Sequence, residues 1–146
     1  MMNPTEVFDR ATRCLLAVDA SGYADTFAID GVVEWPFAAE GWPKRLQGRE
    51  AIRAHVTGIF ARFQTAGRKL VGVRDAINHS IGTHELAVEF SIEATTPTGT
   101  SLLPYVQFLK VTDDGHIAVL RDYFRPMTDA APPAAPKSGS TAGSQR

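Results

Sequence analysis

The sequence predicts an α+β domain, in which a curved and mostly antiparallel sheet carries helices on one face. Three observations support this fold class. Apolar residues recur at helical spacing over residues 4–19 and 48–63. From residue 69 onward they recur at every second position, as in strands. The segments "PTGT" (97–100) and "DDG" (113–115) are tight-turn signals within this second half.

Three helices are expected in the first half. Pro4 suits the first turn of a helix over residues 4–19. Its apolar stripe consists of Val7, Ala11, Cys14, Leu15 and Val18. The segment "ASGY" interrupts this helix, and a short second helix is expected around residues 23–27. The third helix covers residues 48–63, with one stripe formed by Ile52, His55, Val56, Ile59, Phe60 and Phe63.

An early strand and four later strands complete the predicted domain. The segment "IDGVVEWPF" (29–37) indicates a turn and then a strand, which Pro36 ends. A loop with Gly and Pro at its bends follows over residues 38–48. The later strands are expected at 69–81, 84–96, 101–112 and 116–127. We place the folded domain at residues 1–128. Residues 129–146, which are rich in Pro, Ala, Gly and Ser, are expected to form a flexible tail.

Composition and charge exclude several classes of function. The formal net charge is −1, so no broad attraction to nucleic acid or to an anionic membrane is expected. No apolar run approaches the roughly 20 residues of a membrane span. The N-terminus carries Glu6 and Asp9 and is a poor signal peptide, and Cys14 is the single cysteine. We therefore expect a cytoplasmic protein. No nucleotide-binding loop and no metal-ligand spacing occur, so neither a cofactor nor a metal is implied.

Three segments resemble the nuclear transport factor 2-like cone fold, and within it the SnoaL-like group. They are "FAIDGVVEWPF" followed by "LQGREAIRAHV", the hairpin "PTGTSLLPYVQFLKVTDDGHI", and "LRDYFRP" (120–126). The run "EWPFAAEGWPKRLQGREAI" looks most like phenazine-biosynthesis-type members. The resemblance implies a cone-shaped α+β barrel whose N-terminal helices pack on the concave sheet face. It also implies one deep apolar pocket. This fold hosts isomerases, cyclases, epoxide hydrolases and binding domains, so the pocket residues must decide the chemistry.

Two known chemistries of this fold lack their residues here. Ketosteroid isomerase uses a carboxylate base, a tyrosine and a protonated aspartate. The matching positions are Trp35, Cys14 and Gln107, and none of the three is retained. Limonene epoxide hydrolase resembles the "RDYF" motif, and its motif aspartate matches Asp122. Its arginine and second aspartate fall near Glu89 and Ser91, so the bridging arginine is missing.

An Asp122-centred pocket remains, and strand alternation predicts its wall. If Asp122 faces inward, Phe124 does so too, while Arg121 and Tyr123 face outward. The same alternation assigns the inward face to Val33, Trp35, Tyr105, Gln107, Glu89 and Ser91. His55 reaches toward the pocket from the helical side. A poorly solvated carboxylate has a raised pKa unless a neighbour hydrogen-bonds it, and such a group serves as a general acid or base.

We therefore expect cofactor-independent acid–base chemistry on a small apolar or aromatic molecule: isomerisation, cyclisation or dehydration. Asp122 is the first candidate catalytic residue, Glu89 the second, and His55 is included as a catalytic candidate. Two alternatives stay open: a binding module for a hydrophobic metabolite, and epoxide-hydrolase-like water addition. Structural readings also stay open, with Asp122 holding a structural hydrogen bond and His55 as an ordinary core histidine.

The outer sheet face is expected to be apolar. Alternation assigns to it Val88, Phe90, Ile92, Val106 and Phe108. Such a patch is too apolar to remain in water. Cone-fold domains commonly dimerise through this face, so a homodimer is expected.

Overall fold

The computed structural model describes residues 3–125, which form three helices and six strands. The predicted domain end near residue 128 and the predicted tail over 129–146 lie outside these residues. The helices are α1 (Pro4–Leu16), α2 (Ala20–Asp25) and α3 (Arg49–Ala66). The strands are β1 (Phe27–Glu34), β2 (Arg45–Gln47), β3 (Lys69–Gly82), β4 (Glu85–Thr96), β5 (Gly99–Val111) and β6 (Ile117–Phe124).

Local hydrogen bonds explain where the helices begin and end. At the start of α1, the Asn3 side chain accepts from the Glu6 N–H at 2.9 Å, and the Glu6 carboxylate accepts from the Asn3 N–H at 3.0 Å. α1 ends three residues earlier than predicted because Asp19 caps α2, accepting from the Gly22 N–H at 2.8 Å. α3 ends at Gly67, whose φ of 67° is left-handed and favours glycine.

The six strands form one sheet in the order β2-β1-β6-β5-β4-β3. All neighbours are antiparallel except β1 and β6, which run parallel. The strand β2 lies in the segment predicted as a loop. Its three residues are too few to carry a two-residue alternation, so pattern reasoning could not find it.

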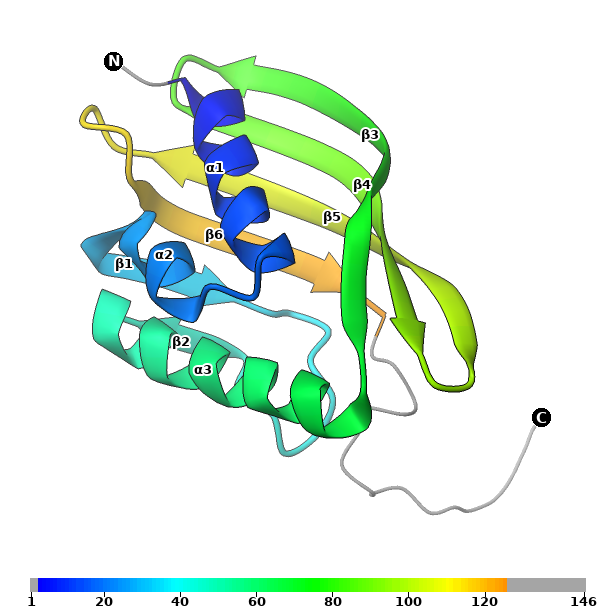
Figure 1. The fold of residues 1–146 in the computed structure, drawn as a ribbon. Helices are drawn as coiled ribbons and strands as arrows, with labels where there is room; N and C mark the ends of the chain where they lie inside the picture. Colours follow the sequence, from blue (N-terminus) through cyan, green and yellow to red (C-terminus); the bar gives the residue numbers. More distant parts are fainter. Residues whose placement is uncertain (1–2, 126–146) are drawn as a thin grey trace.

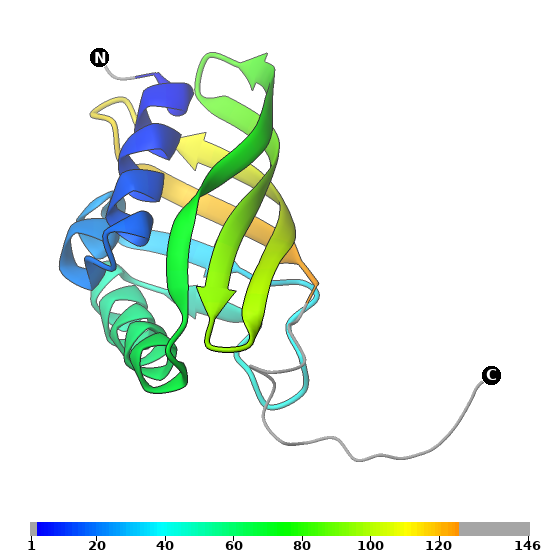
Figure 2. The ribbon, with the colours of Figure 1, turned by 45° about the vertical axis from the view of Figure 1, so that its right-hand side comes forward.

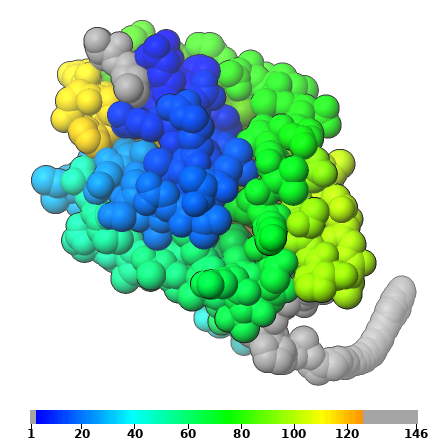
Figure 3. All heavy atoms as spheres, viewed as in Figure 1, coloured from blue at the N-terminus to red at the C-terminus, as the bar shows by residue number. Residues whose placement is uncertain are grey.

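The helices cover one face of a curled sheet (Figures 1 and 2). The space-filling view from the helix side shows α1, α2 and α3 spread over the sheet behind them (Figure 3). Residues of both layers form one core between them: Val7, Phe8, Ala11, Phe27, Val33, Ile52, Val56, Phe60, Leu86, Val88, Phe90, Ile92, Leu109, Val111, Ile117 and Leu120. The predicted fold class, a cone-like α+β domain with N-terminal helices on the concave face, is confirmed.

The inward and outward faces of β4 are the reverse of those predicted. Val88, Phe90 and Ile92 lie in the core, although the prediction placed them on the outer face. Thr96 pairs with Gly99 across the hairpin, so each odd-numbered residue of β5 faces an even-numbered residue of β4. The prediction used odd numbers on both strands and therefore inverted β4. A shift of one residue exchanges the two faces of a strand completely.

Among residues 3–125, no helix is long and apolar enough to cross a membrane.

Candidate functional site

Asp122 lies on the helix-covered face of β6, near the end of the strand. It pairs in register with Gln107 of β5, whose Nε2 donates to Asp122 Oδ1 at 3.1 Å. The indole N–H of Trp35, just after β1, is a second donor to the carboxylate. Three segments distant in sequence therefore meet at one acid.

Burial changes the acidity of Asp122. Loss of solvation raises the pKa of its carboxyl to about 7, although the hydrogen bonds from Gln107 and Trp35 act in the opposite direction. Near neutral pH the acid and its conjugate base are both populated. A group of this kind both accepts and returns a proton efficiently.

Two phenols, Tyr23 of α2 and Tyr105 of β5, lie close enough to Asp122 for its charge to act on them. Burial, and then the charge of Asp122, raise the pKa of each hydroxyl well above its ordinary value. Both phenols are therefore neutral hydrogen-bond donors at every physiological pH. Neither supplies the two hydrogen bonds that Asp122 receives from Gln107 and Trp35.

Aromatic rings line the same face beside the acid. Phe90 and Tyr105 stack with ring centroids 5.3 Å apart and an interplanar angle of 9°, and Phe124 lies 6.0 Å beyond Tyr105. Flat apolar surfaces of this type favour flat apolar ligands.

Accessibility differs along the inner face of the sheet. Toward the β5–β6 turn, Leu109, Val111, Ile117 and Leu120 are buried. Around Asp122 the inward residues keep some accessible surface, namely Tyr23, Trp35, His55, Tyr105, Gln107, Asp122 and Phe124. The inner face is therefore fully shielded from solvent at one end and partly accessible around the acid.

His55 reaches this region from α3, on the helical side. Its ring lies 5.0 Å from the ring of Trp35 and 6.4 Å from the ring of Trp42. Loss of solvation lowers the pKa of its imidazole, so His55 is neutral at pH 7. Val33, which pairs in register with Leu120 of β6, is buried in the core.

The predicted inward placement of Glu89 and Ser91 is wrong. Both lie on the outer face because of the β4 register described above. Glu89 is 54% exposed, and its Oε2 lies 2.8 Å from Nε2 of His79 on β3. Glu89 therefore cannot act together with Asp122, and Ser91 cannot contact a ligand held on the inner face.

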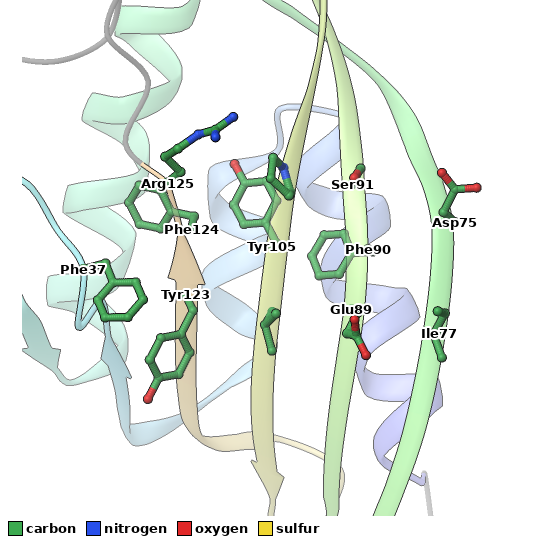
Figure 4. Close-up of a pocket in the computed structure, with 12 residues that line it drawn as sticks. Phe37, Asp75, Ile77, Glu89, Phe90, Ser91, Tyr105, Tyr123, Phe124 and Arg125 are labelled. Carbon is green, nitrogen blue, oxygen red and sulfur yellow. The ribbon is translucent and has the colours of Figure 1, made fainter.

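A hollow of about 560 Å³ lies on the outer side of the sheet (Figure 4). Asp122 is not among its lining residues, which are Phe37, Asp75, Ile77, Glu89, Phe90, Ser91, Pro104, Tyr105, Val106, Tyr123, Phe124 and Arg125. The inner pocket around Asp122 stays a prediction.

Two residues near the site, Tyr23 and Arg68, were missed by sequence reasoning, which considered Trp42 as a lid or a simple anchor. Tyr23 lies on a helix of only six residues, too short for a periodic signal. Trp42 lies in a loop, where pattern does not reveal contacts. Arg68 is buried, and its positive charge lowers the pKa of Tyr105. It follows the C-cap Gly67, and no sequence pattern marks it as part of the site. The aromatic character of Tyr23 was the only available hint.

No group of three or more His, Cys, Asp or Glu side chains within residues 3–125 could hold a metal ion.

Comparison with known proteins shows consistent similarity over nearly the whole described chain. A family model of the SnoaL-like domain matches residues 8–133. An uncharacterised PhzA/B-like protein of Pseudomonas aeruginosa is 34% identical over 129 residues, which are 86% of this chain and 86% of that protein.

Solved structures share the fold at lower identity. A putative isomerase from Bacillus subtilis superposes with a TM-score of 0.69 at 23% identity, covering 86% of this chain and 91% of that one. A putative polyketide cyclase from Silicibacter superposes with a TM-score of 0.62 at 17% identity, covering 83% and 88%. These likenesses establish the fold alone.

Proposed function

Because this chain belongs to the SnoaL-like domain family, we propose that it binds a small apolar or aromatic compound and performs cofactor-independent acid–base chemistry on it. The reaction is an isomerisation, cyclisation or dehydration, in which Asp122 moves a proton between two positions of the ligand. The observation that carries this proposal is an inward carboxyl whose pKa is raised to about 7 among aromatic rings and neutral donors.

The donors around Asp122 suit a ligand that carries a carbonyl. Tyr23 and Tyr105 keep their protons, and neither of them donates the hydrogen bonds that Asp122 receives from Gln107 and Trp35. In this proposal they donate to the carbonyl oxygen while Asp122 removes a proton from the adjacent carbon. Negative charge then develops on the oxygen, where neutral donors in a poorly solvated site stabilise it strongly. Trp35, Phe90 and Phe124 hold the apolar skeleton.

Water addition to an epoxide loses support relative to this reaction. That chemistry requires a second carboxylate next to Asp122, and Glu89 was the candidate. Glu89 lies on the opposite face of the sheet, beside His79. A binding module without chemistry is the remaining alternative, since a half-buried aromatic surface also suits plain binding.

Ligand identification is the first test. Native mass spectrometry of the purified protein, followed by extraction, is expected to reveal a flat, apolar carbonyl compound. The second test distinguishes catalysis from binding. With the identified compound in D₂O, NMR is expected to show deuterium incorporation next to the carbonyl. Binding without any deuterium incorporation or conversion would leave the binding-module alternative.

We also propose that two copies associate through the outer sheet face. Phe37, Ile77, Leu102 and Phe108 expose large apolar side chains there or beside it. Hydrophobic area of this kind is commonly covered by a partner. Sedimentation is expected to give a dimer, and Phe108→Glu is expected to give a folded monomer. A wild-type monomer at high concentration would refute this interface.

The free Cys14 agrees with the proposed cytoplasmic location.

A further inference from the structure

The segment between β1 and β2 forms a closed loop, residues 35–44, which we name the Trp42 loop. The backbone N–H of Trp35 donates to the Lys44 carbonyl at 2.8 Å and joins the two ends of the loop. Within the loop, the backbone N–H of Trp42 donates to the Ala39 carbonyl at 3.1 Å, and Lys44 Nζ donates to the Ala38 carbonyl at 3.0 Å. These bonds hold the loop together internally. Figures 1 and 2 show it beside the end of β6.

One histidine of α3 links both parts of this loop to the helix layer. The ring of His55 lies 5.0 Å from Trp35, at the start of the loop, and 6.4 Å from Trp42, near its tip. The guanidinium of Arg62, about two turns further along the same face of α3, lies 4.9 Å from the centre of the Trp42 ring. Trp35 in turn donates to Asp122. A chain of contacts therefore runs from Arg62 through Trp42, His55 and Trp35 to the acid.

The tip of the loop has little other support on this side. Gly41 has φ of 90°, and a Cβ placed on it would meet nothing within 4 Å. The remaining aromatic of the loop, Phe37, faces the other way and contacts Tyr123 on the outer sheet face, 5.3 Å between rings. Trp42 is thus the aromatic residue by which the tip contacts α3.

We propose that the Trp42 loop is a gate over the Asp122 site, and that His55 is the positioning residue that latches it. The imidazole holds Trp42 closed on one side and keeps Trp35 against Asp122 on the other. A flat apolar ligand enters when Trp42 leaves His55. This inference rests on the proposed function in one respect only, namely that the Asp122 site receives a ligand.

The energies involved suit a gate. An aromatic contact of this type changes an equilibrium by roughly two- to tenfold, so the latch holds the loop closed without fixing it permanently. Removing the contact is expected to increase the open population by a similar factor.

Limited trypsin digestion of the native protein tests the latch, with cleavage after Lys44 as the readout. Trp42→Ala is expected to raise the cleavage rate roughly two- to tenfold, and His55→Leu, which keeps volume without an aromatic ring, is expected to do the same. If Trp42→Ala does not fold, Trp42→Phe is expected to give a smaller increase in the same direction. Unchanged cleavage in folded Trp42 and His55 variants would overturn the gate.

Titration of the Asp122 carboxyl by NMR tests the positioning role. His55→Leu is expected to raise its pKa, because a loosened Trp35 no longer supports the ionised form through its hydrogen bond. Trp35→Phe gives the reference shift for complete loss of that bond. Phe37→Ala is the matched control, which alters the same loop on its outer side and is expected to leave the titration unchanged. Tyr23 and Tyr105, the titratable neighbours of Asp122, stay intact in all these variants.

A shift in Trp35→Phe without any shift in His55→Leu would overturn the positioning role. Neither readout requires turnover, so the two proposals fail separately. Positive latch results with no catalysis on any ligand would refute the acid–base proposal alone. Because Trp35 and Trp42 are the only tryptophans of the chain, their fluorescence also reports on this cluster specifically.

Discussion

Asp122 and Glu89 are carboxylates on the two strands that flank β5, and they lie on opposite faces of the same sheet. Asp122 has partly accessible aromatic neighbours, accepts hydrogen bonds from Gln107 and Trp35, and has its pKa raised to about 7. Glu89 is half exposed and lies next to His79. The same functional group is thus a candidate acid–base catalyst in one place and the hydrogen-bond partner of a surface histidine in the other. Strand register alone makes the difference.

The largest expected effect separates the two acids by chemistry. Asp122→Asn is expected to lower the rate of deuterium incorporation or turnover by about 10²- to 10⁴-fold, because the proton-transfer group is lost. Affinity for the ligand is expected to stay within a few-fold. Glu89→Gln is the matched control, since it makes the same change on the outer face, and its rate is expected to match the wild type. Equal losses in both variants would contradict the assignment of Asp122.

The next effect tests the corrected register of β4. Phe90 is 5% exposed and packs edge-on against Phe8 of α1, with centroids 5.3 Å apart. Phe90→Ala is expected to reduce the free energy of unfolding by about 3–5 kcal/mol. Glu89→Ala, one residue away, is expected to change it by less than about 1 kcal/mol. Urea unfolding followed by circular dichroism measures both changes. If Glu89→Ala were the more destabilising of the two variants, Glu89 and not Phe90 would face the core, as predicted from the sequence.

A pH-dependent effect of intermediate size follows from the raised pKa of Asp122. Below pH of about 4 its carboxyl is protonated in both folded and unfolded chains. Between pH of about 4 and 7 only the folded chain keeps the proton, so wild-type stability falls as pH rises through this window. The total loss is on the order of 4 kcal/mol.

Asp122→Asn removes this penalty. The variant is therefore expected to gain stability relative to the wild type between pH 4 and 8, approaching the full difference at the upper end. Parallel unfolding curves at each pH are the measurement. A constant difference between the two proteins at every pH would mean that the carboxyl is not buried in the way described.

The smallest expected effect concerns the outer acid. Glu89→Gln breaks the contact with His79, an exposed pair that contributes about 0–1 kcal/mol. The change in unfolding free energy is expected to shrink further in high salt, which screens exposed charges. A large, salt-independent loss would instead indicate that this face is covered, as in the proposed dimer.

Much of the fold followed from sequence pattern. The helical stripe containing Ile52, Val56 and Phe60 and the four later strands are regular enough for periodicity to identify them. Alternation also gave the faces of β5 and β6 that carry Gln107 and Asp122. It failed on β4 because parity between paired strands depends on hairpin geometry at Thr96 and Gly99, which alternation within one strand does not contain.

The rest of the candidate site could not be predicted for a different reason. Tyr23 and Trp42 belong to a short helix and a loop, and they come near the acid only through tertiary packing. No local pattern records that a loop tryptophan lies against a histidine 13 residues later in the chain. The burial of Arg68 likewise depends on tertiary packing that no local pattern records.

The parallel pairing of β1 with β6 affects how this protein is made. During synthesis on the ribosome, β1 emerges first among the strands and β6 last, yet β6 occupies the middle of the finished sheet. A nascent chain that lacks its final strand leaves β1 and β2 separated from the β3–β5 meander. Closure of the sheet must therefore await the synthesis of β6, the strand that carries Asp122.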